Sequence, residues 1–114
     1  MDSILTSTKK ALGIEEAYEH FDPDIIMHIN SVFSILQQLG VGDPAGFAIE
    51  DKTQDWSDFI PDEDPRLNMV KTYMYAKVRM IFDPPQSSIV AEAINHTISE
   101  LEWRLNVQVD PKSE

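Results

Sequence analysis

The 114-residue sequence contains no cysteine and no long apolar run. Without cysteine, the chain can form neither a disulfide nor a thiolate metal site. No stretch approaches the roughly 20 apolar residues that span a bilayer, and residues 1–13 lack a basic start followed by a long apolar stretch. We therefore expect neither a membrane span nor a signal peptide, and no membrane partner.

Basic residues are also scarce. Nine Lys and Arg stand against 20 Asp and Glu, which gives a formal net charge of −11. General affinity for DNA phosphates depends on cations that displace counterions, so stable nucleic-acid binding is disfavoured. The content of 42% hydrophobic and 25% charged residues is ordinary for a globular protein. It predicts one folded domain at residues 1–106, followed by a short C-terminal tail at residues 107–114.

Apolar spacing and capping signals predict four helices. Asp22-Pro23 and Asp64-Pro65 each combine an N-cap residue with a proline at the first helical position. Asp2 or Ser3 can begin the first helix, and Ser87 or Ser88 the last. The predicted helices cover residues 4–12, 23–39, 65–82 and 89–106.

The segment 41–64 interrupts this pattern, because glycine and proline punctuate short apolar islands. We expect one short strand at 47–49 and one helical turn near 56–60. Seven acids at residues 50–64, against Lys52 alone, make the second part of the segment strongly negative. The predicted fold class is mainly α: a compact bundle of about four helices, with a long acidic irregular loop between the second and third and an extended C-terminal tail.

No residue pattern points to catalysis. His20, His28 and His96 stand far apart, and none forms the pair four residues apart that zinc hydrolases carry. The acids at 50–51 and 62–64 lack the spacing of a calcium loop, and a solvated loop explains them better. A phosphate-binding glycine loop and a nucleophile elbow are also missing. We therefore predict no enzyme, no metal and no cofactor.

Two tryptophans and one charged helix face are the candidates for binding. Trp56 lies in the acidic segment, and Trp103 lies off the apolar stripe of the last helix. Either suggests an interface, although an intramolecular contact is equally plausible for each. Lys71, Tyr75 and Arg79 recur every four residues, so they share one face of the third helix.

Four segments carry a resemblance to a known family: MDSILTSTKKALGI, DIIMHINSVFSILQQLGVG, LNMVKTYMYAKVRMIFDPPQSS and ISELEWRLN. Together they resemble the head-tail connector (adaptor) proteins of tailed bacteriophages and prophages of Gram-positive bacteria. The likeness covers most of residues 1–106. Its signature is a long apolar helix ending in Leu-Gly, an acidic Trp-x-x-Phe loop, a helix ending in Phe-Asp-Pro-Pro, and a Glu-Leu-Glu-Trp-Arg-Leu close.

The resemblance implies a structural protein of the virion neck, assembled in the host cytoplasm. Such proteins form a homo-oligomeric ring, usually twelvefold, that docks under the portal protein. The ring extends the DNA channel and supports the next neck or tail protein, and DNA passes through without stable specific binding. Two alternatives stay open: a small acidic inhibitor that mimics DNA, and a small enzyme that uses its acids with a divalent cation.

Three sets of residues follow as hypotheses under this implied role. The subunit interface would use Lys71, Tyr75, Arg79, Asp51, Asp55, Asp58, Trp56 and Trp103. The portal would contact the tail through Val107, Gln108, Val109, Asp110 and Pro111, although a disordered end is equally plausible. Acids that face the channel would be Glu50, Asp62 and Glu63, with simple exposure to solvent as an equal alternative.

Overall fold

A computed structural model describes residues 3–109, which form five helices. They are α1 (Ile4–Ala11), α2 (Asp22–Gln38), α3 (Trp56–Phe59), α4 (Leu67–Phe82) and α5 (Ser88–Val109). The predicted mainly helical class is confirmed, and α3 is the helical turn expected in the acidic segment. Within residues 3–109 the strand expected at 47–49 does not form, and the only β-type pairing is an isolated bridge between Ser3 and Asp55.

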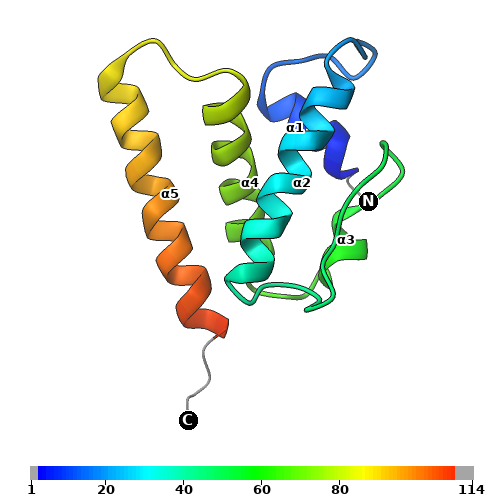
Figure 1. Cartoon of the computed structure of the whole chain (residues 1–114), viewed down its shortest axis with the longest axis vertical. Coiled ribbons are helices and arrows are strands. Elements are labelled where there is room, and N and C mark those ends of the chain that lie inside the picture. The colour runs from blue at the N-terminus through cyan, green and yellow to red at the C-terminus, as the bar shows by residue number, and fades with distance from the viewer. Residues whose placement is uncertain (1–2, 110–114) are drawn as a thin grey trace.

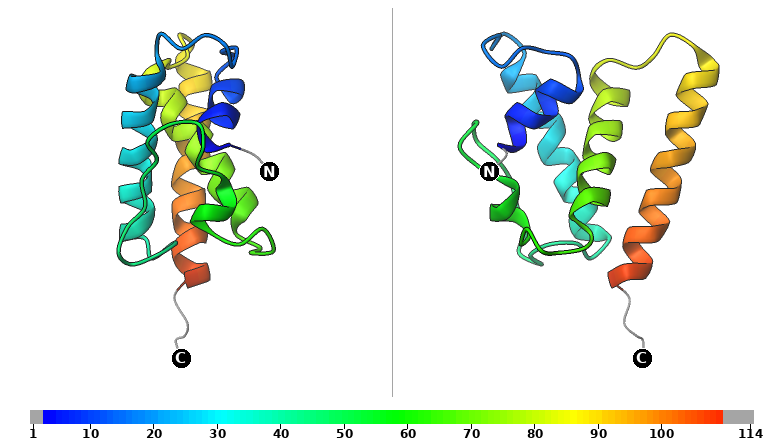
Figure 2. Two further views of the ribbon diagram at one scale, coloured as in Figure 1. Left: turned by 90° about the vertical axis from the view of Figure 1, so that its right-hand side faces the viewer. Right: turned by 180° about the vertical axis from the view of Figure 1, so that it is seen from behind.

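The central helix is α4. It packs on α2 and α1 on one side and on α5 on the other. Figure 1 shows α5 at one edge of the molecule, and the right-hand view in Figure 2 shows α1 and α2 together on the other side of α4, where they contact each other. The fully buried core comes mainly from α2 and α4, with contributions from α1 and α5: Ile4, Ile25, Ile29, Val32, Leu36, Val70, Tyr73, Met74, Val78 and Leu105.

Two predicted helix caps prove wrong, although the helices themselves are confirmed. α2 begins at Asp22, with Phe21 as its N-cap residue. α4 begins at Leu67, and the Asp64 carboxylate accepts hydrogen bonds from the Arg66 backbone N–H (2.8 Å) and guanidinium (2.7 and 3.0 Å). Neither aspartate is the N-cap residue of its helix. Each carboxylate instead pairs with a cation, which is a stronger hydrogen-bonding partner than a backbone N–H alone.

That cation, for Asp22, is the buried Lys9. Its side chain is 2% exposed, and its ammonium lies 2.8 Å from the Asp22 carboxylate. It also donates to the carbonyl oxygens of Glu16 (2.9 Å) and Tyr18 (2.7 Å). The ammonium thus has two hydrogen bonds and one ion pair, and these partners compensate for the burial of its charge. Lys9 fixes the connector between α1 and α2 to both helices.

The irregular segment after α2 is held down by side chains of that helix. The Asn30 amide forms a two-point clamp on Ile49, donating to its carbonyl (3.0 Å) and accepting from its N–H (2.8 Å). Gln37 donates to the Pro44 carbonyl (2.8 Å). At Gly42 the backbone has φ +86°, and a Cβ there would lie 2.6 Å from a ring carbon of Phe59. Only glycine fits this approach of the segment to the core.

The last helix runs further than expected. α5 continues to Val109, so Val107, Gln108 and Val109 belong to the helix rather than to the predicted tail. Asp110 and Pro111, the other two predicted portal contacts, lie outside the described residues. The helix therefore continues three residues beyond the end that the sequence predicts for it.

Replacing Lys9 by methionine tests the importance of the buried cation. The Lys9→Met variant keeps the volume but leaves the Asp22 carboxylate and two carbonyls without their donor. We expect the free energy of unfolding to fall by about 3 kcal/mol in urea denaturation, as for a broken buried ion pair. The matched control is Lys10→Met at the neighbouring exposed lysine, which should change stability by less than about 0.5 kcal/mol. Equal effects of the two substitutions would contradict this role of Lys9.

Candidate interaction surfaces

The first candidate surface lies where α3 meets α4 and α1. Trp56 is 2% exposed, and its indole N–H donates to the Ser7 hydroxyl (3.0 Å). The Lys71 ammonium lies over the indole, 6.0 Å from the ring centroid, and the Tyr75 ring packs edge-on at 6.3 Å. Trp56 therefore makes an intramolecular contact, which was one of its two interpretations, and its part in a subunit interface stays a prediction.

The contacts around Trp56 bear on the predicted pairing between the acidic segment and the α4 face that carries Lys71, Tyr75 and Arg79. Lys71 and Tyr75 contact the acidic segment of their own protomer, through the ring of Trp56. Their contribution is to hold α3 against α4, with a cation–π contact worth about 0.5–2 kcal/mol. Arg79, one turn further along α4, is exposed. Of the three residues on the predicted face, Arg79 is the one whose side chain is mainly open to solvent.

Most acids of the segment 50–64 have local structural roles. Asp51 accepts from the backbone N–H (2.8 Å) and hydroxyl (2.6 Å) of Thr53, and the hydroxyl bond is the main reason that its pKa is lowered. The Asp58 carboxylate accepts from the Asp55 N–H (2.9 Å) at the start of α3. The Arg66 guanidinium lowers the pKa of Asp64. These acids shape the segment as well as charging it.

The three acids predicted to face a channel are open to solvent. Glu50, Asp62 and Glu63 are all exposed. They come from the two ends of the segment, before and after α3. The structure describes their positions on one protomer, and their orientation toward a channel stays a prediction.

The contact between α4 and α5 contains a polar clasp. The buried Tyr73 hydroxyl donates to the Glu102 carboxylate at 2.6 Å, and the Lys77 ammonium lies 4.0 Å from the same oxygen. Burial and the neighbouring carboxylate both raise the pKa of Tyr73, because each disfavours the phenolate. On the outer side of α5, Trp103 is 67% exposed, as the sequence predicts.

A groove also opens between these two helices, and the sequence reasoning missed it. Its volume is about 310 Å³, and its walls are almost wholly carbon, from Ala76, Ile89, Val90, Ala93, Ile94 and Thr97. Ile89 and Val90 are 78% and 44% exposed. The signal in the sequence is the adjacent pair Ile89-Val90, because one apolar stripe of a helix can bury only one of two neighbours.

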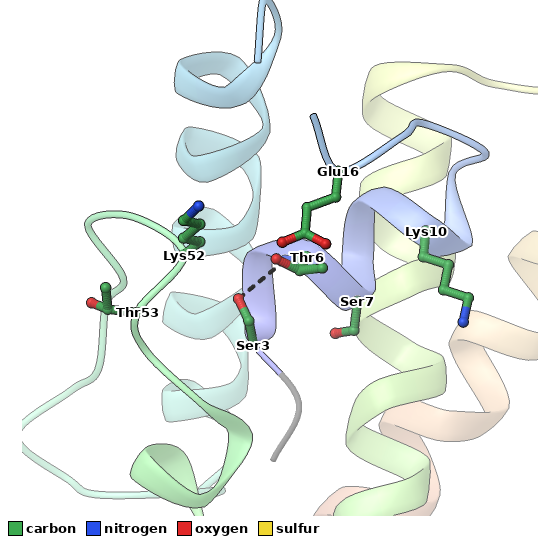
Figure 3. A pocket seen from close by; sticks show the side chains of 7 residues that line it. All are labelled: Ser3, Thr6, Ser7, Lys10, Glu16, Lys52 and Thr53. Carbon is green, nitrogen blue, oxygen red and sulfur yellow. Dashed lines mark hydrogen bonds between the residues drawn. The ribbon is translucent and has the colours of Figure 1, made fainter. Parts of the chain in front are cut away.

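A second hollow, of about 510 Å³, lies beside α1, and every residue that lines it has a polar or charged side chain. Figure 3 shows Lys10 and Lys52 on opposite sides of it, with Glu16 between them. The Ser7 hydroxyl donates to the Ile4 carbonyl (3.2 Å) and accepts from Trp56, so both of its functions are occupied. No histidine lines the hollow.

Metal ligands and membrane spans were also sought in the described part of the chain. Among residues 3–109, no group of three or more His, Asp or Glu side chains is placed to hold a metal ion. Over the same residues, no helix combines the length and the apolar character needed to cross a bilayer.

Comparison with known proteins gives one match. A family described as "Phage connector protein" matches residues 4–112. No significant match is found among curated proteins or among solved structures. The matched range includes every helix of the structure, so the likeness covers the whole folded unit.

Replacing Tyr73 by phenylalanine tests the clasp. Loss of the bond to the charged Glu102 should lower the free energy of unfolding by about 1–2 kcal/mol near neutral pH. Because the folded-state pKa of Tyr73 lies above its ordinary value of 10.0, its contribution is complete below pH 10 and decreases as the pH rises further. The stability difference between wild type and Tyr73→Phe should therefore be constant up to about pH 10 and shrink as the pH rises further. A difference that is independent of pH would argue against the clasp.

Proposed function

The chain belongs to the phage connector protein family, and from this membership we propose that it works in the phage neck as a ring under the portal. Connector proteins are structural components of the virion, and their partners are other capsid and tail proteins. The observation that carries the proposal is the extent of the family match, which spans residues 4–112. We propose a homo-oligomeric ring of about twelve copies whose head-to-tail contacts close on themselves.

In this proposal the ring extends the DNA channel and offers a platform to the next neck or tail protein. The net charge of −11 per copy supports it, because an acidic wall repels phosphates and lets DNA slide without adhering. We propose Glu50, Asp62 and Glu63 as acids of that wall. Their exposure leaves them free to act on passing DNA, whereas Asp64 is engaged with Arg66.

The contacts between copies are proposed to use Trp103 and Arg79. Trp103 is 67% exposed, compared with 50% for Tyr18. Burial of a tryptophan at an interface can contribute about 2 kcal/mol or more. Trp56 stays in the proposal as well, although it is only 2% exposed in one protomer. The border of the proposed contact surface includes five further residues, which their intramolecular contacts orient: Lys71, Tyr75, Asp51, Asp55 and Asp58.

The portal contact is proposed for the C-terminal end. Val107, Gln108 and Val109 extend α5, so they would present one further helical turn, followed by Asp110 and Pro111. A chain end that becomes ordered on binding adds interface area at an entropic cost. The end of α5 thereby connects the folded unit directly to the portal.

The first test is the mass of the assembly. Purified protein is mixed with its cognate portal, and the mixture is measured by light scattering and imaged by negative-stain microscopy. We expect a ring bound to the portal, whether or not the free protein is monomeric, because the portal can template the ring. A protein that stays monomeric and does not bind the portal would refute the proposal and favour the DNA-mimicking alternative.

The second test removes the chain end. A stop codon after Val109 deletes residues 110–114 and leaves α5 whole, which separates loss of contact from loss of fold. We expect unchanged thermal unfolding and at least tenfold weaker binding to the portal. The matched control replaces Lys112 and Glu114 with alanine in the full-length chain and should bind normally. Full binding by the truncated protein would exclude residues 110–114 from the portal contact.

A further inference from the structure

Exposed apolar side chains gather at one end of the molecule. Six large ones remain exposed in the described chain, and five of them are Tyr18, Met27, Ile81, Ile89 and Val90, from 44% to 78% exposed. They come from the connector between α1 and α2, the first half of α2, the end of α4 and the start of α5. Figures 1 and 2 show these parts together at one end, and the packing of Phe21 on Phe82 at 5.2 Å joins two of them.

These residues form two unlike surfaces on different sides of that end. One is the α4–α5 groove, which is lined by the small residues Ala76, Ala93 and Thr97 and by the larger Ile89, Val90 and Ile94. It is a hollow of about 310 Å³ with almost no polar atoms. An apolar hollow of this size loses contacts unless a side chain fills it.

The other surface is a projection on α2. Ile25 and Ile29 are fully buried, and Met27, midway between them in sequence, points to the opposite side of the helix and is 58% exposed. Methionine is unbranched and flexible, so it adapts to irregular apolar hollows. Met27 is therefore a suitable side chain to enter this groove.

Charge distinguishes these two surfaces further. Asp24 precedes Met27 by three residues and shares its side of α2, whereas Arg79 follows Ala76 by three residues and shares its side of α4. Both charged side chains are exposed. When Met27 sits over Ala76, Asp24 and Arg79 come within about one helical turn of each other. In a chain of net charge −11, an arginine beside an apolar groove selects an acidic partner surface.

From this geometry we infer that the occupant of the groove is a second copy of the chain: Met27 of one protomer enters the α4–α5 groove of the next, and Asp24 faces Arg79. The inference rests on the proposed ring and names its contact. Two unlike surfaces on one subunit produce a head-to-tail interface, which closes into a ring. Both surfaces lie at the same end of the bundle, so rotation about an axis along the helices brings them to the same height.

Engineered cysteines test the contact, since the chain has none of its own. Rings assembled on the portal from a Met27→Cys, Ala93→Cys double variant are oxidised and analysed by denaturing, non-reducing electrophoresis. We expect a ladder of covalent multimers, because disulfides form only when the Cα atoms lie within about 7 Å. A matched Ser34→Cys, Ala93→Cys pair, with an exposed cysteine further along α2, should stay monomeric.

The outcomes separate this inference from the proposed function. Rings that form without a ladder would overturn the contact and leave the ring standing, whereas wild-type protein that forms no ring would overturn the function. Dimers from Met27→Cys alone would reveal a two-fold contact between identical surfaces and would also overturn the inference.

A charge exchange gives an independent reading that does not depend on cysteine geometry. Asp24→Arg and Arg79→Asp should each weaken ring assembly at least tenfold. Each should lower the free energy of unfolding by no more than about 1 kcal/mol, because the exposed side chains lie in the first turn of α2 and the last turn of α4, where their charges favour the helix dipole. The double variant, which restores opposite charges, should recover most of the assembly. Normal assembly by the two single variants would overturn the pairing of Asp24 with Arg79. A double variant whose loss of assembly equals the combined losses of the single variants would overturn it as well.

Discussion

The architecture depends on one buried cation. Lys9 lies in a chain with few bases, yet its ammonium is enclosed by a carboxylate and two backbone carbonyls. Burial of a charge is tolerable only when each of its hydrogens has an acceptor, so Lys9 determines where the connector and the start of α2 must lie. α2 in turn holds the irregular segment through Asn30 and Gln37. One ammonium thus positions nearly half of the chain.

The sequence predicted the helices well, because apolar spacing and proline positions are local signals. The Asp22-Pro23 and Asp64-Pro65 pairs marked two helix starts within three residues, although neither aspartate caps its helix. Sequence reasoning assigned each carboxylate to the nearest backbone, whereas in the fold Lys9 and Arg66 compete for them. Arg66 is a neighbour in sequence, but the partnership of Lys9 with Asp22 needs the chain to turn first. Such a pair cannot be recognised from spacing alone.

The surfaces were less predictable than the helices. Trp56 and Trp103 have the same chemistry, but the burial of Trp56 requires Ser7, which is 49 residues away. Only the folded structure distinguishes the two. The α4–α5 groove was missed for a related reason: a helical stripe indicates which residues face a neighbouring helix, and the distance to that neighbour decides whether they touch it. Ile98 and Leu105 are buried against the bundle, whereas Val90, on the same stripe, remains exposed.

The two halves of α5 are therefore held to α4 to different degrees. The Tyr73–Glu102 bond fastens its C-terminal half to α4, while the groove separates its N-terminal half from the same helix. The N-terminal half of α5 would therefore have more freedom to move than the C-terminal half. A neighbouring copy that fills the groove would restrict this motion, and the ordered copy would bind the subunit on its other side more tightly. Assembly would then be cooperative, with complete rings favoured over partial arcs.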